Sequence, residues 1–160
     1  MRLLIAAVGR LKAGPERELL ERYRTRFGDL GKRLGLHPVV WHELNESRAA
    51  TAARRCAEEG SALLERAAGA DAIFVLDERG KVLSSPAVAR LLAQTRDEGA
   101  GLLAILIGGP DGLSPAVREA ARVRIAFGAI TLPHGLARIV LAEQLYRAAT
   151  ILARHPYHRP

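Results

Sequence analysis

Cysteine and aromatic residues are scarce in this chain. Cys56 is its single cysteine, and only 4% of its 160 residues are Phe, Trp or Tyr. With no second thiol or nearby histidine, Cys56 can form neither a redox pair nor a metal site, so we interpret it as structural. Long apolar runs are also missing, because Gly9 interrupts the aliphatic start too early for an export signal or a membrane span. These absences predict a cytoplasmic protein with no membrane segment and no metal.

Basic residues, in contrast, are in excess. The chain has 24 Lys and Arg against 17 Asp and Glu, which gives a formal net charge of +7. Such a charge favours a polyanionic partner, since each neutralised phosphate releases condensed counterions. Charge alone leaves RNA, DNA, acidic membranes and an ordinary solvated surface all open, because it does not say where the cations cluster.

The order of the expected elements predicts the fold class. At 160 residues and 49% hydrophobic content, the chain can close one core but hardly two, so we expect a single domain over 1–160. Aliphatic segments typical of buried strands lie at 1–8, 38–44, 72–76, 102–107 and 123–127. Helical segments separate them, and the residues expected to cap three of these are Ser47 or Thr51, Ser84, and Ser114. This alternation predicts an α/β fold with a parallel sheet covered on both faces.

The last expected helix, 136–154, is apolar around most of its circumference. A helix of this kind needs cover on more than one side. In a chain this short, we expect a second subunit to supply part of that cover.

Ligands of open parallel sheets bind at the carboxyl ends of the strands. We therefore expect a site at the loops that follow Leu76, Ile107 and Phe127. The glycine-rich loop 108–112 fits neither the dinucleotide-binding nor the P-loop pattern, which disfavours a nucleoside triphosphate and a flavodoxin-like regulator. Its glycines either let a flat ligand lie against the backbone or simply form a turn.

The C-terminal segment 154–160 gathers two His, one Tyr and two Arg. Arg pairs with phosphate, and Tyr and His stack on bases, so this composition favours RNA over a metal. A disordered basic tail is the alternative.

Five motifs follow one another in the second half of the chain. They lie at 76–81, 107–114, 131–134, 143–148 and 155–159, and read Leu-Asp-Glu-Arg-Gly-Lys, Ile-Gly-Gly-Pro-Asp-Gly-Leu-Ser, Thr-Leu-Pro-His, Glu-Gln-Leu-Tyr-Arg-Ala and His-Pro-Tyr-His-Arg. With these motifs and this length, the chain resembles the RlmH family of ribosomal large-subunit pseudouridine methyltransferases, part of the SPOUT superfamily.

The resemblance implies a three-layer SPOUT fold with a C-terminal deep trefoil knot, and a homodimer. It implies methylation of N3 of a pseudouridine in 23S ribosomal RNA on assembled ribosomes, with S-adenosyl-L-methionine as cofactor. The residues that it assigns to the cofactor are Leu76, Gly108, Phe127, Gly128, Ala129, Ile130, Thr131 and Leu132.

The reaction suggests roles for polar residues near the C-terminus. The imide N3–H must lose its proton, so a base and a nearby cation would help. We expect His158 or Tyr157 to manage the proton, and Arg159 and Arg138 to hold RNA phosphate or the developing anion. Glu143 is either the base or an orienter of Arg147, one helical turn away.

Two alternatives to this function stay open. One is a SPOUT methyltransferase that acts on another RNA position, either a ribose hydroxyl or a different base. The other is a noncatalytic ribosome-binding or nucleotide-binding module, which the charge and the fold alone would permit.

Overall fold

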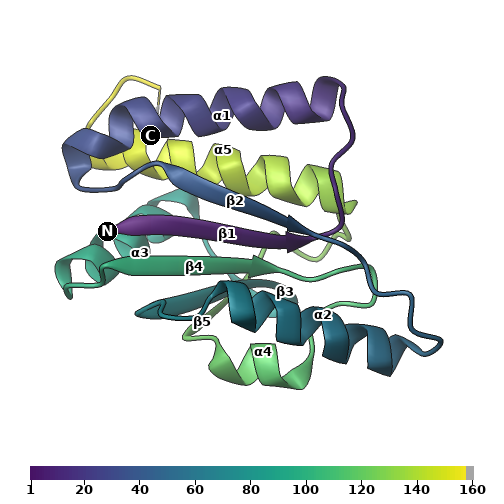
Figure 1. The fold of residues 1–160 in the computed structure, drawn as a ribbon. Coiled ribbons are helices and arrows are strands. Elements are labelled where there is room, and N and C mark those ends of the chain that lie inside the picture. Colours follow the sequence, from purple (N-terminus) through teal and green to yellow (C-terminus); the bar gives the residue numbers. More distant parts are fainter. Residues whose placement is uncertain (158–160) are drawn as a thin grey trace.

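A computed structural model describes residues 1–157 of the chain and shows a five-stranded sheet between helices (Figure 1). Every strand pair is parallel, and the strand order is β2-β1-β4-β3-β5. The strands are β1 Arg2–Val8, β2 Val39–Leu44, β3 Ala72–Val82, β4 Leu102–Ile107 and β5 Val123–Ala126. The helices are α1 Pro15–Gly31, α2 Ala52–Arg66, α3 Ser85–Asp97, α4 Pro115–Ala120 and α5 His134–Leu152, with a 3-10 turn at Lys32–Leu34. The α/β prediction is confirmed.

The sheet separates two helical layers (Figure 1). Helices α1, α3 and α5 cover one face, and α2 and α4 cover the other. Alternate residues of β1 point to opposite layers: Leu3 and Ile5 pack with the first group, Ala6 and Val8 with the second. Because side chains alternate along a strand, both faces of a parallel sheet must be apolar, which explains its unbroken aliphatic runs.

Hydroxyl side chains begin three of the helices, as the sequence predicts. Thr51 caps α2, Ser84 caps α3 and Ser114 caps α4, each accepting a bond from a backbone N–H of the first turn. Ser47, the other candidate for α2, instead bonds the carboxylates of Glu58 and Glu59.

Strand β3 differs from the expectation that it ends in a loop after Leu76. It continues to Val82, and both Leu76 and Lys81 pair with Ile125 of β5, so residues 77–80 form an excursion between two paired stretches. Gly80 permits the close approach of the two strands, because a Cβ there would lie 2.7 Å from backbone atoms of Arg124 and Ile125. The strand therefore extends beyond the expected end because residues 81–82 pair with β5, which is a non-local contact.

Helix α5 packs against α1 on one side and α3 on the other (Figure 1). Its buried residues include Ile139, Leu141, Leu145 and Ala149. Much of the cover that its apolar circumference requires therefore comes from within the chain. Among residues 1–157, no helix has both the length and the apolar character to cross a membrane.

Candidate functional site

A cavity of about 570 Å³ opens at the carboxyl ends of β4 and β5, beside residues 76–79 of β3. The loops after β4 and β5 form much of its wall, with the excursion of β3 and the first turn of α5. Seven of the eight residues predicted to contact the cofactor line it, namely Leu76, Gly108, Phe127, Gly128, Ile130, Thr131 and Leu132. Ala129, the eighth, is not part of the lining. The structure thus brings together residues from distant parts of the sequence at the expected edge of the sheet.

The loop after β4 is a tight turn. The N–H of Gly112 donates to the carbonyl of Gly109 over 2.9 Å, and Gly112 has a φ of +87°. A Cβ on Gly108 would lie 2.6 Å from the carbonyl oxygen of Gly112, so a larger residue there would open the turn. The same glycines therefore close the turn and keep side chains out of the cavity wall.

The loop after β5 presents backbone and apolar side chains to the cavity. Gly128 has a φ of +112°, a conformation that other residues rarely adopt, and a Cβ there would meet nothing within 4 Å. Ile130 is 72% exposed although it is apolar. Such a wall suits a ligand with a flat apolar part.

Two ion pairs flank the cavity. Arg118 donates from Nε to Asp77 over 2.7 Å, and Arg55 donates from Nε to Asp111 over 2.6 Å. Burial alone would raise the pKa of Asp77, but the bonds from Arg118 and from the N–H of Arg79 outweigh it and lower that pKa. Asp77 is therefore an anion at neutral pH, and Arg118 stays fixed beside it.

His134 and Ala137 line the cavity from the start of α5. His134 and Asp77 both lie in motifs of the sequence, and neither was expected to have a role in the site. Both could have been found from the sequence, because each follows directly on a segment expected at the edge of the site.

Arg138 is enclosed by the chain, with a side chain only 3% exposed. Its guanidinium donates to the carbonyl oxygens of Val8 and Gly9 and lies 3.3 Å from Glu43 Oε1. Burial lowers the pKa of Arg138, and the neighbouring Glu43 opposes that shift. This position differs from the exposed one that a contact with RNA phosphate needs.

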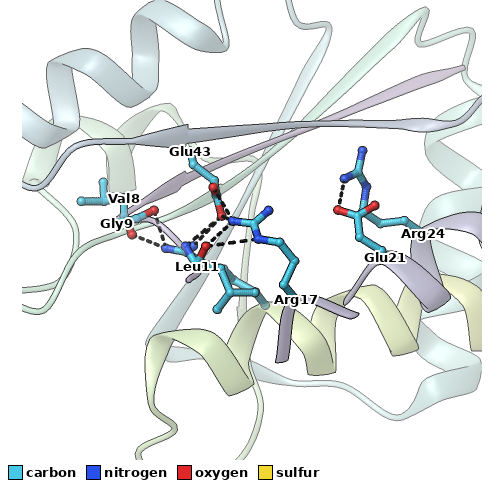
Figure 2. Close-up of polar contacts among 8 residues, drawn as sticks. Val8, Gly9, Leu11, Arg17, Glu21, Arg24 and Glu43 are labelled. Carbon is cyan, nitrogen blue, oxygen red and sulfur yellow. Dashed lines mark hydrogen bonds and ion pairs between the residues drawn. The ribbon is translucent and has the colours of Figure 1, made fainter. Parts of the chain in front are cut away.

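Glu43 also binds Arg17, as Figure 2 shows. The Arg17 guanidinium lies 2.8 Å from Glu43 Oε2, and it donates to the carbonyl oxygen of Leu11. Burial would raise the pKa of Glu43, but the bonds from Arg17 and from the Leu11 N–H, with the charge of Arg138, lower it. The cluster ties α1, β1, β2 and α5 together, because each supplies or contacts one of its members.

Tyr157 packs on the later part of α5. Its ring lies 4.7 Å from that of Tyr146 and 5.1 Å from the Arg147 guanidinium, and its hydroxyl donates to Glu143 over 3.3 Å. Burial and the charge of Glu143 raise the pKa of Tyr157 to about 12, so it keeps its proton at neutral pH. Glu143 also binds Arg147 over 2.8 Å. His158 and Arg159 lie outside the described residues.

The tail and the cavity are separated along α5. Ala137 lines the cavity, whereas Glu143, six residues later, contacts Tyr157, a rise of about 9 Å along the helix. Figure 1 shows the segment 153–157, which follows α5, on the same side as the amino end of β1, away from the carboxyl ends of β1 and β4. The structure thus groups the predicted cofactor residues and sets them apart from Tyr157.

Comparisons with known proteins identify the family. A family model described as "Predicted SPOUT methyltransferase" matches residues 1–158. The chain is 52% identical to "Ribosomal RNA large subunit methyltransferase H" of Bradyrhizobium sp. strain BTAi1 and 54% identical to that of Bradyrhizobium diazoefficiens, each time over 99% of both chains.

A solved structure agrees on the fold. The crystal structure of a probable methyltransferase from Bordetella pertussis Tohama I matches 92% of this chain and 95% of its own, with a TM-score of 0.52 at 14% identity. The structural likeness supports the three-layer arrangement, and the two sequence relatives show the family. The chain therefore belongs to the RlmH family of SPOUT methyltransferases.

Proposed function

We propose that the chain transfers a methyl group from S-adenosylmethionine to N3 of a pseudouridine in 23S ribosomal RNA. The substrate is the assembled ribosome, which places the reaction in the cytoplasm. The observation that carries the proposal is the cavity at the carboxyl edge of the sheet, lined by seven of the eight expected cofactor residues in a chain over 50% identical to ribosomal RNA methyltransferases.

The lining residues fit S-adenosylmethionine. A cavity of about 570 Å³ falls within the usual range for small-molecule sites. Leu76, Phe127 and Ile130 offer apolar surface for an adenine ring, and the backbone of 128–132 offers N–H and C=O groups for its edge. Gly128 faces open space, which leaves room for the ligand.

When bound, S-adenosylmethionine supplies a methyl group on a positively charged sulfur. The acceptor nitrogen must lie in line with that methyl group, so positioning by the cavity is the main task of the chain. The imide proton must also leave, and His158 is the base that accepts it in this proposal. Tyr157 keeps its own proton at neutral pH and therefore serves as a hydrogen-bond donor and not as the base. Arg159 holds RNA phosphate or the imide anion.

Glu143 and Arg138 act by positioning. Glu143 accepts bonds from Arg147 and from Tyr157, which favours the orienting role over that of a base. Arg138 fixes the start of α5, next to the cavity residues His134 and Ala137. Neither side chain needs to touch the RNA.

The separation of tail and cavity supports a homodimer in which the tail of one subunit completes the cavity of the other. The C-terminal deep trefoil knot belongs to the same proposal, since a knotted segment holds the loops after β4 and β5 in a fixed shape. A mixed dimer of a His158→Ala subunit and a Gly128→Leu subunit tests it. Action across the dimer leaves one intact site and about half of the activity, whereas action within one chain leaves none.

The function itself is tested by transfer of labelled methyl from S-adenosylmethionine to ribosomes that lack the modification. Isolated large subunits and naked ribosomal RNA are the parallel substrates. We expect label at N3 of one pseudouridine, chiefly on whole ribosomes. Label on a different nucleotide would favour the alternative target, and binding of cofactor without transfer would favour the noncatalytic module.

Calorimetric titration with S-adenosylmethionine tests the cavity, using Gly128→Leu and the matched control Gly69→Leu. Both glycines have positive φ and open space around a Cβ, so each variant places leucine in a backbone conformation that it rarely adopts. Gly128 lines the cavity, whereas Gly69 follows α2 and is absent from its lining. We expect loss of binding in Gly128→Leu alone. Equal binding in both variants would mean that S-adenosylmethionine does not bind in this cavity.

A further inference from the structure

A second hollow, of about 600 Å³, lies between the end of the β3 excursion and the segment 118–124. We refer to it as the cationic groove, because five of its nine lining residues are Arg79, Lys81, Arg118, Arg122 and Arg124. Glu119 is the one acidic residue in that lining. Arg79 and Arg118 also line the cofactor cavity, so the two hollows adjoin.

Carboxylates neutralise only part of this charge. Arg118 pairs with the buried Asp77, and Arg122 lies 2.6 Å from Glu98. Arg79 has only a 3.9 Å contact with Glu78, and both of those side chains are 75% exposed. Within residues 1–157, neither Lys81 nor Arg124 forms an ion pair. The groove therefore holds exposed positive charge that the described part of the chain leaves available for a ligand.

The backbone gives the groove its shape. Gly80 lies so close to β5 that a Cβ would come within 2.7 Å of the backbone of Arg124 and Ile125. This approach returns β3 to pairing at Lys81, opposite Ile125, after the excursion. Cations from two strands thus line one hollow at a fixed spacing, which a loop of free lysines would not provide.

We propose that the cationic groove binds the phosphodiester backbone of the RNA substrate, beside the nucleotide in the cofactor cavity. The inference rests on the proposed function, which supplies RNA as the ligand. Arginine pairs with phosphate through two parallel N–H bonds, and a row of cations matches the repeating charge of a nucleic-acid strand. The lining contains no aromatic ring on which a base could stack, so the groove positions the strand and does not read its sequence.

The test compares Lys81→Ala/Arg124→Ala with Lys32→Ala/Arg33→Ala. Each double variant loses one lysine and one arginine, and Lys32 and Arg33 are exposed residues of the 3-10 turn after α1. Binding to a 23S ribosomal RNA fragment that spans the methylated pseudouridine is measured at several salt concentrations. For two lost phosphate contacts, the slope of log K against log salt falls by about 1.4–1.8, and affinity at 0.15 M salt falls about fifteen- to thirtyfold.

We expect this change in the groove variant and an unchanged slope in the control. Neither Lys81 nor Arg124 lines the cofactor cavity, so the affinity for S-adenosylmethionine stays at the wild-type value and shows that the variant is folded. In methyl transfer, KM for RNA rises and kcat is kept.

Equal slopes for the groove variant, the control and the wild-type chain would overturn the inference. Failure of the proposed function has a different signature, since the wild-type chain would then transfer no methyl to any ribosomal substrate. The salt dependence of RNA binding tests the groove in either case.

Discussion

Two groups of arginines in this molecule differ in what surrounds them. The cluster of Arg17, Glu43 and the buried Arg138 lies by β1 and β2, and the cationic groove lies by β3 and β5. The Arg138 side chain is 3% exposed and bonded to two carbonyl oxygens and a carboxylate. The Arg79 side chain is 75% exposed, and its ion-pair contact, with Glu78, is 3.9 Å long. The residue type is the same, and the surroundings differ.

The difference follows from the cost of removing a charge from water. A buried guanidinium is tolerated only where carbonyl or carboxylate oxygens replace its hydration, so its partners lie within the fold. An exposed guanidinium keeps its water and can exchange it for phosphate. Local pairing therefore shows which of the 24 basic residues are free to bind a polyanion, and the net charge of +7 does not.

The largest expected effect comes from Arg138→Met. The substitution leaves the carbonyl oxygens of Val8 and Gly9 and part of Glu43 without a donor. Losing one member of a buried charged group costs several kcal/mol, so we expect the free energy of unfolding to fall by about 3 kcal/mol. Urea denaturation of the purified variant measures it.

Arg138→Lys sharpens the same comparison. Lysine keeps the charge but lacks the planar guanidinium that bonds several oxygens at once. The free energy of unfolding should therefore fall, but by less than in Arg138→Met. If both variants kept full stability and instead lost affinity for ribosomal RNA, Arg138 would contact the RNA after all, and the comparison would fail.

A smaller loss is expected from Gly80→Ala in the floor of the groove. The new Cβ would overlap the backbone of β5, and the two strands would have to separate at a cost of about 2 kcal/mol in unfolding free energy. Gly101→Ala is the control, because a Cβ there comes no closer than 3.4 Å to the Asp71 carboxylate. Thermal unfolding of the two variants should differ, and equal midpoints would show that β3 and β5 can part freely.

Acid should weaken the cluster of Arg17, Glu43 and Arg138 through Glu43. Its pKa is lowered in the folded chain, so its contribution to stability is present above the unfolded pKa, near 4.5, and is lost as pH falls through the lower folded value. We expect the Glu43 contribution, about 1 kcal/mol of unfolding free energy, to disappear as pH falls below 4.5 and through the lower folded pKa. Glu43→Gln removes this titration, so its stability should depend less on pH over that range. An unchanged pH dependence would mean that Glu43 has the same pKa in both states.

Local signals in the sequence predict much of the fold. Ser84 and Ser114 precede helices that they cap, and β4 occupies 102–107 as its aliphatic run indicates. The position of the cavity also follows, because the carboxyl ends of parallel strands meet at one edge. These features depend on neighbouring residues or on one rule of sheet topology.

Features that depend on distant partners could not be predicted. Arg138 is separated from Glu43 by 95 residues and from Gly9 by 129, so nothing near it in the sequence marks it as buried. The extension of β3 through charged residues and the groove beside it both depend on pairing with β5. The presence of an arginine in the sequence is therefore a weak guide to RNA contact until its partners are known.

The smallest effect on stability is expected from Lys81→Ala/Arg124→Ala. These side chains form no ion pair within residues 1–157 and lie among other cations, so their loss removes repulsion and leaves no buried group unsatisfied. The free energy of unfolding should stay within about 0.5 kcal/mol of the wild-type value at 0.15 M salt and rise slightly at low salt, where repulsion is less screened. A loss of more than about 1 kcal/mol would place these cations with Arg138 as parts of the fold. Unchanged stability with weaker RNA binding would separate the two groups, since the same charge would then support folding in one place and binding in the other.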